Sequence, residues 1–125
     1  MIHVKATVRG EPDAPAFTRV FDYDEEIFLS SAKVIEEKVQ RNMKINAGEA
    51  LIAYCAHVVR SIRAGKQDNN IQDEARKILS VDKVMIGVPE TLRVITFEAT
   101  IDSRPARKIV LKQPIPAGEY SMVGG

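Results

Sequence analysis

The chain has 125 residues, of which 45% are hydrophobic and 28% are charged, a composition typical of one globular domain with a single core. Its 18 basic and 17 acidic residues nearly balance, which argues against a nucleic-acid or anionic-membrane surface built on bulk charge. No apolar run approaches the roughly 20 residues that span a bilayer, and no signal peptide is recognisable. The single cysteine excludes an internal disulfide and a cysteine-based zinc site. We therefore expect a cytoplasmic protein without nucleic-acid or membrane partners.

Residues 1–21 read as a β-hairpin. Its first strand alternates polar residues with Ile2, Val4, Ala6 and Val8, the period of a strand with one apolar face. Residues 10–15 are rich in chain-breaking residues and form the turn, and residues 16–21 return as the second strand. An end strand of this kind must bury its apolar face, and its open edge can pair with another chain. The hairpin therefore either thickens the chain's own core or forms a contact surface, and the second alternative predicts a homo-oligomer.

Two amphipathic helices follow the hairpin. Asp22 or Asp24 caps the first helix, whose apolar stripe consists of Phe28, Ala32, Ile35, Val39 and Met43. Asn46 and Glu49 have the spacing of a capping box that opens the second helix, and Gly65 is placed to end it. The buried stripe of the second helix consists of Ala47, Ala50, Leu51, Tyr54, Cys55, Val58 and Ile62.

A third helix and a sharp joint lead into the last hairpin. Asn70 caps the third helix, which carries Ile71, Ala75, Ile78 and Leu79, and one more turn starts at Ser80 or Asp82. Gly87 is expected to close this helical part in the left-handed conformation, and Pro89 to prevent its continuation. The period then changes to two, with Ile95, Phe97, Ala99 and Ile101 on one face. Residues 108–112 form the partner strand, with Glu98 opposite Lys108 or Lys112.

These elements predict an α+β fold. It is a small bundle of three to four helices with a C-terminal antiparallel β-hairpin, to which residues 1–21 add the N-terminal hairpin. Residues 22–115 are expected to form the main domain, and residues 116–125 a flexible, Pro/Gly-rich tail.

The joint carries a family resemblance. The segment Val84-Met85-Ile86-Gly87-Val88-Pro89-Glu90, with Glu98-Ala99-Thr100 after it, resembles the Val-Met-x-Gly-Val-Pro-Glu joint and the Glu-Ala-Thr strand of bacterial urease γ subunits. Asn46-Ala47-Gly48-Glu49-Ala50 is similar to the helix opening of that family, and Gly65-Lys66 to its Asp-Gly-Lys turn, with Ala64 in place of the aspartate. Lys108-Ile109-Val110 and Gln113-Pro114-Ile115 are similar to its closing strand. The residues from Pro114 to Tyr120 resemble the join to a urease β subunit. The N-terminal hairpin departs from the family, whose members begin with the first helix.

The resemblance implies a non-catalytic γ-type subunit of a urease or urease-like nickel amidohydrolase. Urea hydrolysis to ammonia and carbamate would be carried by a separate α-type subunit, which also holds the nickel, and the partners would be α- and β-type subunits. No catalytic, cofactor-binding or metal-binding residue is then expected in this chain. The structural or interface candidates are Asn46, Glu49, Gly65, Gly87, Val88, Pro89, Glu90 and Glu98.

The residues themselves agree with a chain that has no reacting group. His3 and His57 lie in different predicted elements, and Cys55 falls on an apolar stripe as a buried thiol. Two further hypotheses remain beside the urease subunit. The chain is either a urease-γ-like interaction module that self-associates or binds an unrelated partner, or a small-molecule binding domain with a pocket near Tyr54, His57 and Arg60.

Overall fold

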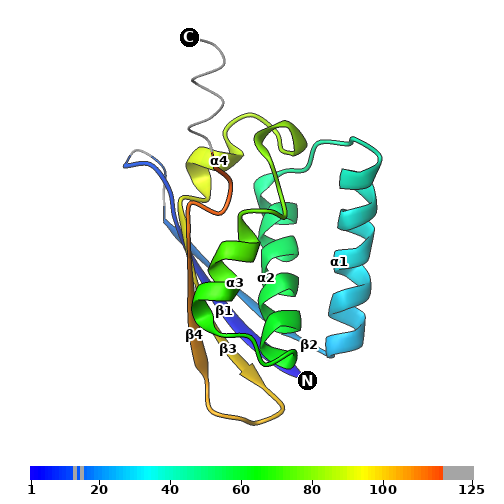
Figure 1. The fold of residues 1–125 in the computed structure, drawn as a ribbon, viewed down its shortest axis with the longest axis vertical. Coiled ribbons are helices and arrows are strands. Elements are labelled where there is room, and N and C mark those ends of the chain that lie inside the picture. The colour runs from blue at the N-terminus through cyan, green and yellow to red at the C-terminus, as the bar shows by residue number, and fades with distance from the viewer. Residues whose placement is uncertain (13, 15, 117–125) are drawn as a thin grey trace.

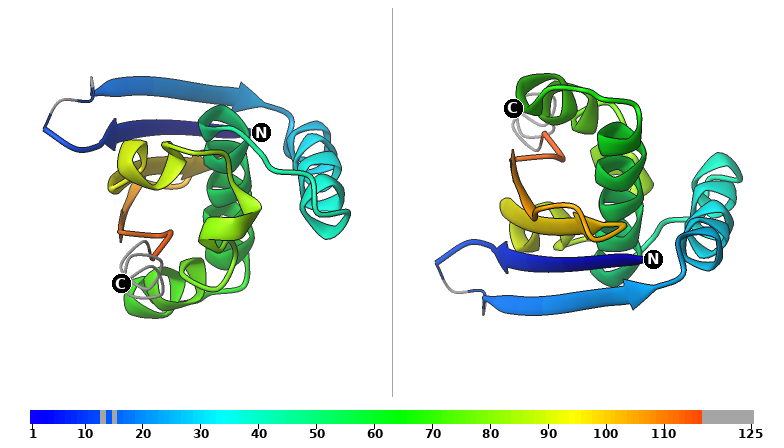
Figure 2. Two further views of the ribbon diagram at one scale, coloured as in Figure 1. Left: turned by 90° about the horizontal axis from the view of Figure 1, so that it is seen from above. Right: turned by 90° about the horizontal axis from the view of Figure 1, so that it is seen from below.

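A computed structural model describes residues 1–12, 14 and 16–116, so the predicted tail lies outside the described residues from residue 117 on. In chain order the elements are β1 (Ile2–Arg9), β2 (Phe17–Tyr23), α1 (Glu25–Gln40), α2 (Ala47–Arg63), α3 (Asp68–Ala75), a 3₁₀ turn η1 (Val81–Lys83), α4 (Val88–Thr91), β3 (Val94–Ile101) and β4 (Arg107–Lys112). The strands form one antiparallel sheet, and the helices lie on one of its faces (Figures 1 and 2). The predicted α+β class and both predicted hairpins are confirmed.

The sheet joins the two hairpins, in the order β2-β1-β3-β4. β1 pairs with β2 from Ile2 opposite Tyr23 to Val8 opposite Phe17, and with β3 from Ile2 opposite Ile101 to Arg9 opposite Val94. The predicted apolar face is confirmed, because Ile2, Val4, Ala6 and Val8 are all at most 1% exposed. The expectation that the first strand has an open edge is wrong. β1 is an inner strand that pairs on both sides, so the outer edge belongs to β2.

Helix α1 begins where the sequence pattern places it and ends earlier. The Asp24 side chain is the N-cap and accepts hydrogen bonds from the backbone N–H groups of Glu26 and Ile27. Asn42 has φ 61°, which turns the chain out of the helical direction soon after Gln40. Met43 is therefore 52% exposed, and its predicted place on the buried stripe is wrong.

Helix α2 is the central helix. The capping box of Asn46 and Glu49 is confirmed, and Gly65 follows the helix with φ 75°. The helix contacts α1, α3 and β3, so residues outside the predicted stripe are buried as well. These additional residues are Ala53, Ala56, Val59 and Ser61.

Helix α3 starts earlier than predicted and covers the edge of β4. Its N-cap is Gln67, which makes no side-chain capping bond, so the prediction of Asn70 as the cap is wrong. The Lys112 N–H donates to Gln72 Oε1 at 3.3 Å, and the Lys112 carbonyl accepts from Arg76 Nη2 at 3.2 Å. Arg107 donates to Asp68 Oδ1 at 2.6 Å. The β4 edge is thereby occupied by side chains of α3.

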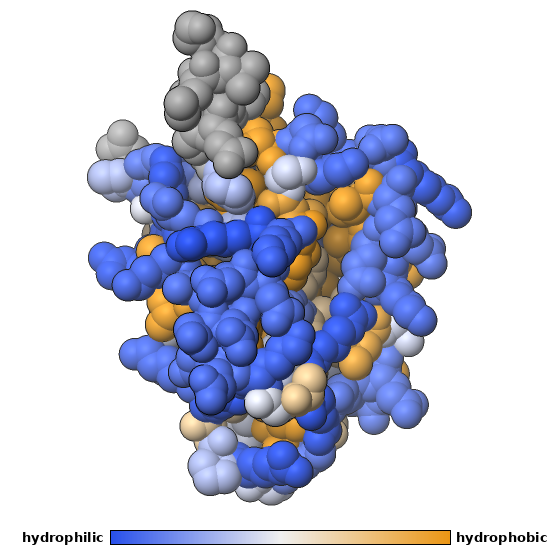
Figure 3. Space-filling model, viewed as in Figure 1, coloured by the Kyte–Doolittle hydropathy of each residue, from blue (hydrophilic) through white to orange (hydrophobic). Residues whose placement is uncertain are grey.

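The helical face is mainly hydrophilic at its surface. Figure 3 shows hydrophilic residues over most of this face, with hydrophobic residues visible in the gap between α1 and the neighbouring helices. Over the residues that the structure describes, none of the helices is long and apolar enough to cross a membrane. In the same residues, no three side chains of His, Cys, Asp or Glu are grouped so that they could hold a metal ion.

Candidate interface at the joint before β3

The segment of residues 84–92, here called the joint, connects η1 with β3. Gly87 has φ 92°, so its predicted left-handed conformation is confirmed. The prediction that it closes a helix is wrong, because Gly87 is the N-cap of the short helix α4. Pro89 lies in the first turn of α4, where its missing N–H removes no helical hydrogen bond. The joint is thus a glycine-initiated helical turn rather than a helix end.

One side of the joint is buried in the core, and the other is exposed to solvent. Val88, Pro89 and Leu92 are buried, whereas Met85 is 47% exposed and Ile86 is 102% exposed. Single exposed apolar residues are common on protein surfaces, whereas several of them side by side mark a contact surface. Met85 N–H donates to the carbonyl of Ile45 at 2.9 Å, and this places the exposed Met43 segment next to the joint. We call Met43, Met85 and Ile86 the joint surface.

The joint also contacts the N-terminal hairpin. The Glu11 N–H donates to the carbonyl of Glu90 at 2.9 Å, and Arg93 forms an ion pair with Glu11. A Cβ atom at Gly10 would lie 2.6 Å from the Glu90 carbonyl oxygen and 2.8 Å from that of Thr91. Only glycine fits at this position without a shift of backbone, so the hairpin turn packs directly on α4.

The capping residues of α2 connect it to α1. Lys38 Nζ donates to Glu49 Oε2 at 2.7 Å, and the Asn46 N–H donates to Glu49 Oε1 at 3.1 Å. The hydrogen bond from Lys38, supported by that from Asn46, lowers the pKa of Glu49 although partial burial opposes the shift. Glu49 therefore links the end of α1 to the start of α2, and its role is structural.

The remaining sequence candidates lie apart from the joint. Gly65 ends α2, and Glu98 lies on the solvent face of β3. Glu98 is opposite Lys108 on one side and Lys5 on the other, so its predicted cross-strand partner is Lys108 and not Lys112. Of the candidate residues, the structure brings together only residues 87–90. Asn46 directly follows Ile45, whose carbonyl accepts a hydrogen bond from the joint segment.

The structure does not support a ligand pocket at Tyr54, His57 and Arg60. Tyr54 is fully buried, and its burial raises the pKa of the phenol. His57 Nε2 lies 2.8 Å from the carbonyl of Ile71, and Arg60 Nη1 donates to Glu36 at 2.6 Å. Cys55 is buried as predicted, and its burial raises the pKa of the thiol to about 12. Each of these groups is engaged in packing or pairing.

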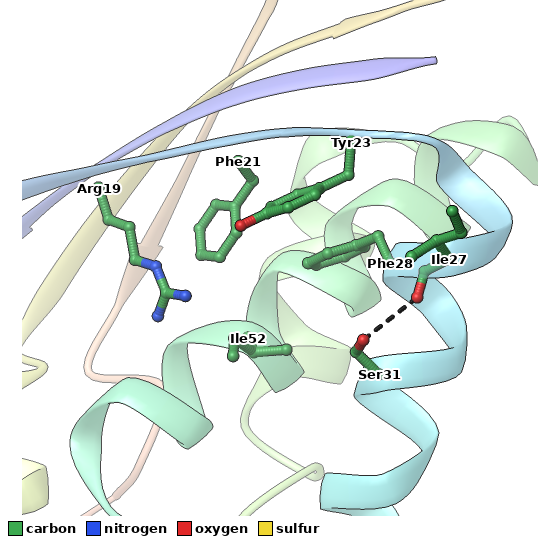
Figure 4. Close-up of a pocket in the computed structure, with 7 residues that line it drawn as sticks. All are labelled: Arg19, Phe21, Tyr23, Ile27, Phe28, Ser31 and Ile52. Carbon is green, nitrogen blue, oxygen red and sulfur yellow. Dashed lines mark hydrogen bonds between the residues drawn. The ribbon is translucent and has the colours of Figure 1, made fainter.

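An indentation between β2 and α1 was not predicted. It has a volume of about 170 Å³ and is lined by Arg19, Phe21, Tyr23, Ile27, Phe28, Ser31 and Ile52 (Figure 4). The rings of Tyr23 and Phe28 stack at 6.2 Å, and the Arg19 guanidinium lies 4.7 Å from the centre of the Phe21 ring. Sequence patterns could not reveal it, because its lining combines β2 and α1 with Ile52 of α2, and no local pattern determines how α2 lies against the other two elements.

Comparison with known proteins assigns the family. The family model of the urease gamma subunit matches residues 21–115. The chain belongs to the urease gamma subunit family. A urease subunit gamma of Halalkalibacterium halodurans is 30% identical over 92 residues, which are 73% of this chain and 91% of the relative. A urease subunit gamma of Streptomyces coelicolor is 28% identical over 85 residues, which are 68% of this chain and 84% of the relative.

The family match includes the joint and excludes most of the N-terminal hairpin. Residues 21–115 contain every helix that the structure describes, together with β3 and β4, but only the last three residues of β2. In this member of the urease gamma subunit family, β1 and most of β2 therefore lie outside the matched region. β1 is an inner strand of the sheet, and β2 forms one of its edges.

Proposed function

We propose that the chain is a non-catalytic γ-type subunit of a urease or urease-like nickel amidohydrolase and that it acts through assembly contacts. The observation that carries the proposal is the family match over residues 21–115. The hydrolysis of urea to ammonia and carbamate, and the nickel, belong in this proposal to a separate α-type subunit. A β-type subunit completes the complex.

The joint surface is the contact that we assign to this assembly. Ile86 is wholly exposed next to Met85, while Val88 and Pro89 anchor the same turn in the core. A turn that is anchored in the core and presents apolar side chains suits a protein contact, because little backbone freedom is lost on binding.

Co-expression with α- and β-type urease chains tests the proposal. Affinity capture of this chain is expected to retain both partners, and Ile86→Asp is expected to abolish their retention. Val34→Asp is the matched control, since Val34 is a 56% exposed apolar residue on α1 outside the joint surface. A failure to retain an α-type chain, or equal retention by Ile86→Asp, would contradict the proposal.

The isolated chain is expected to release no ammonia from urea, with or without nickel. Nickel-dependent release by the purified chain that is lost in His57→Ala would place the chemistry here and overturn the non-catalytic assignment.

A second candidate is a urease-gamma-like interaction module without a role in urea hydrolysis. The observation that favours it is the N-terminal hairpin, most of which lies outside the family match. The same capture experiment separates the two functions, because this module self-associates or retains an unrelated protein and does not retain an α-type urease chain.

A further inference from the structure

The two edges of the sheet differ in how they are covered. The β4 edge is covered by α3, whose Gln72 and Arg76 bind the backbone of Lys112. Strand β2 forms the other edge and pairs only with β1 among the described residues. Both views of Figure 2 show no element on the far side of β2. One row of backbone donors and acceptors along β2 is thus available for pairing.

The exposed edge carries only part of the usual protection against pairing. Edge strands that must stay single are usually protected by charged side chains, especially lysine, by proline or by a bulge. The sequence of β2 is FTRVFDY, which contains no lysine or proline, and its two charged residues are Arg19 and Asp22. Three of its large apolar residues are exposed, with Phe17 at 38%, Val20 at 50% and Tyr23 at 44%.

We propose that β2 pairs antiparallel with β2 of a second copy of this chain, about a two-fold axis through Val20. The two sheets then continue as one across the interface. In this register Val20 is opposite its own copy, and Arg19 is opposite Phe21. The outer pairs are Thr18 with Asp22 and Phe17 with Tyr23. Residues directly opposite in an antiparallel pair share a face, so both helical layers lie on the same side of the joined sheet.

The register is self-complementary at each position. Phe17 and Tyr23 form an aromatic pair at each end, and the Thr18 hydroxyl is placed to donate to the Asp22 carboxylate. Arg19 already lies over the Phe21 ring of its own chain and meets the same kind of ring across the axis.

Other registers place unfavourable groups opposite each other. An axis through Arg19 sets two guanidinium groups face to face, and an axis through Asp22 does the same with two carboxylates. An axis through Phe21 sets Val20 against Asp22. Like charges directly opposite destabilise a strand pair, which disfavours the axes through Arg19 and Asp22, and the Phe21 axis sets an apolar side chain against a carboxylate. Val20 is therefore the axis that the sequence of β2 favours.

This proposal does not depend on the proposed function, because most of β2 lies outside the family match. It is tested on the purified full chain without any urease subunit. Light scattering at rising concentration is expected to show a mass of twice 13.9 kDa. Val20→Lys places two lysines on the axis and is expected to reduce the mass to that of one chain.

The matched control is Val110→Lys. Val110 lies on the same outer face of the sheet, on the edge strand that α3 covers, so this variant is expected to keep the doubled mass. A charge exchange then separates lost pairing from lost folding. Val20→Glu alone is expected to be monomeric, and an equimolar mixture of Val20→Lys and Val20→Glu is expected to restore the doubled mass.

The register is tested by cross-linking. Val20→Cys treated with diamide is expected to give a disulfide-linked pair of chains, because opposite Cα atoms in an antiparallel pair are close enough for a disulfide. Cys55 is fully buried and stays out of the reaction, and Val110→Cys is the control that is expected to remain uncross-linked. A wild-type chain that is monomeric at high concentration, a Val20→Lys variant that keeps the doubled mass, or a failure of Val20→Cys to cross-link would overturn the proposal.

Discussion

Replacing Gly87 tests the backbone conformation of the joint. Gly87 has φ 92°, and a Cβ atom built there meets no atom within 4 Å. Space is therefore available, and the cost of Gly87→Val comes from the backbone conformation alone, at about 1–2 kcal/mol. With a urea m value of roughly 2 kcal/mol/M, the unfolding midpoint is expected to fall by roughly 0.5–1 M.

The matched control for Gly87→Val is Gly48→Ala. Gly48 lies in the first turn of α2, and its added Cβ would have Asn46 Oδ1 at 3.4 Å as its nearest neighbour, which is ordinary contact. Alanine at this helical position is expected to raise stability by about 0.5–1 kcal/mol. Urea denaturation followed by circular dichroism measures both variants. A midpoint that stays unchanged in Gly87→Val, while Gly48→Ala moves upward, would refute the left-handed turn at the joint.

Three further substitutions test contacts of the fold, each by urea denaturation. Gly10→Ala is expected to lower the free energy of unfolding by about 1–3 kcal/mol, because its Cβ overlaps the Glu90 carbonyl oxygen; no change would mean that the hairpin does not pack on α4. Tyr54→Phe is expected to raise that free energy by about 1 kcal/mol, because the buried hydroxyl has no hydrogen-bond partner among the described residues. A lower free energy of unfolding in this variant would mean that the hydroxyl does have a hydrogen-bond partner. Lys38→Met is expected to cost about 0.5 kcal/mol at pH 7. Because the folded-state pKa of Glu49 is lowered, this deficit is fully present above the usual value of 4.5 and is lost as the pH falls through the lowered pKa. A deficit that does not shrink as the pH is lowered would contradict the pairing.

Much of the fold follows from local patterns in the sequence. The alternation of Ile2, Val4, Ala6 and Val8 predicts a strand with one buried face, and the spacing of Asn46 and Glu49 predicts the start of α2. These features depend on residues a few positions apart, so the sequence contains all the information that determines them. The left-handed Gly87 is predictable for the same reason, since glycine tolerates this conformation at little cost.

Features that depend on distant segments could not be predicted in the same way. β1 lies between β2 and β3 because it pairs with β3, which is more than 80 residues away along the chain. No local pattern in the sequence predicts this pairing. The exposure of Ile86 depends on which side of α4 faces the core. The interface candidates were inferred from a family pattern, which identifies the joint segment but not the side chains that face water.

The central position of β1 affects the order in which the protein can fold during synthesis. Ile2 pairs with Ile101, so the second edge of β1 has no partner until helices α1 to α4 and strand β3 have left the ribosome. At a synthesis rate of roughly 5–20 residues per second, the hairpin waits about 4–16 seconds with one edge unpaired. Pairing between such distant segments also slows folding, since the loop between them must close first. During this time the early hairpin exposes the β1 edge and the apolar face of Ile2, Val4, Ala6 and Val8, and an edge of this kind can pair with other chains.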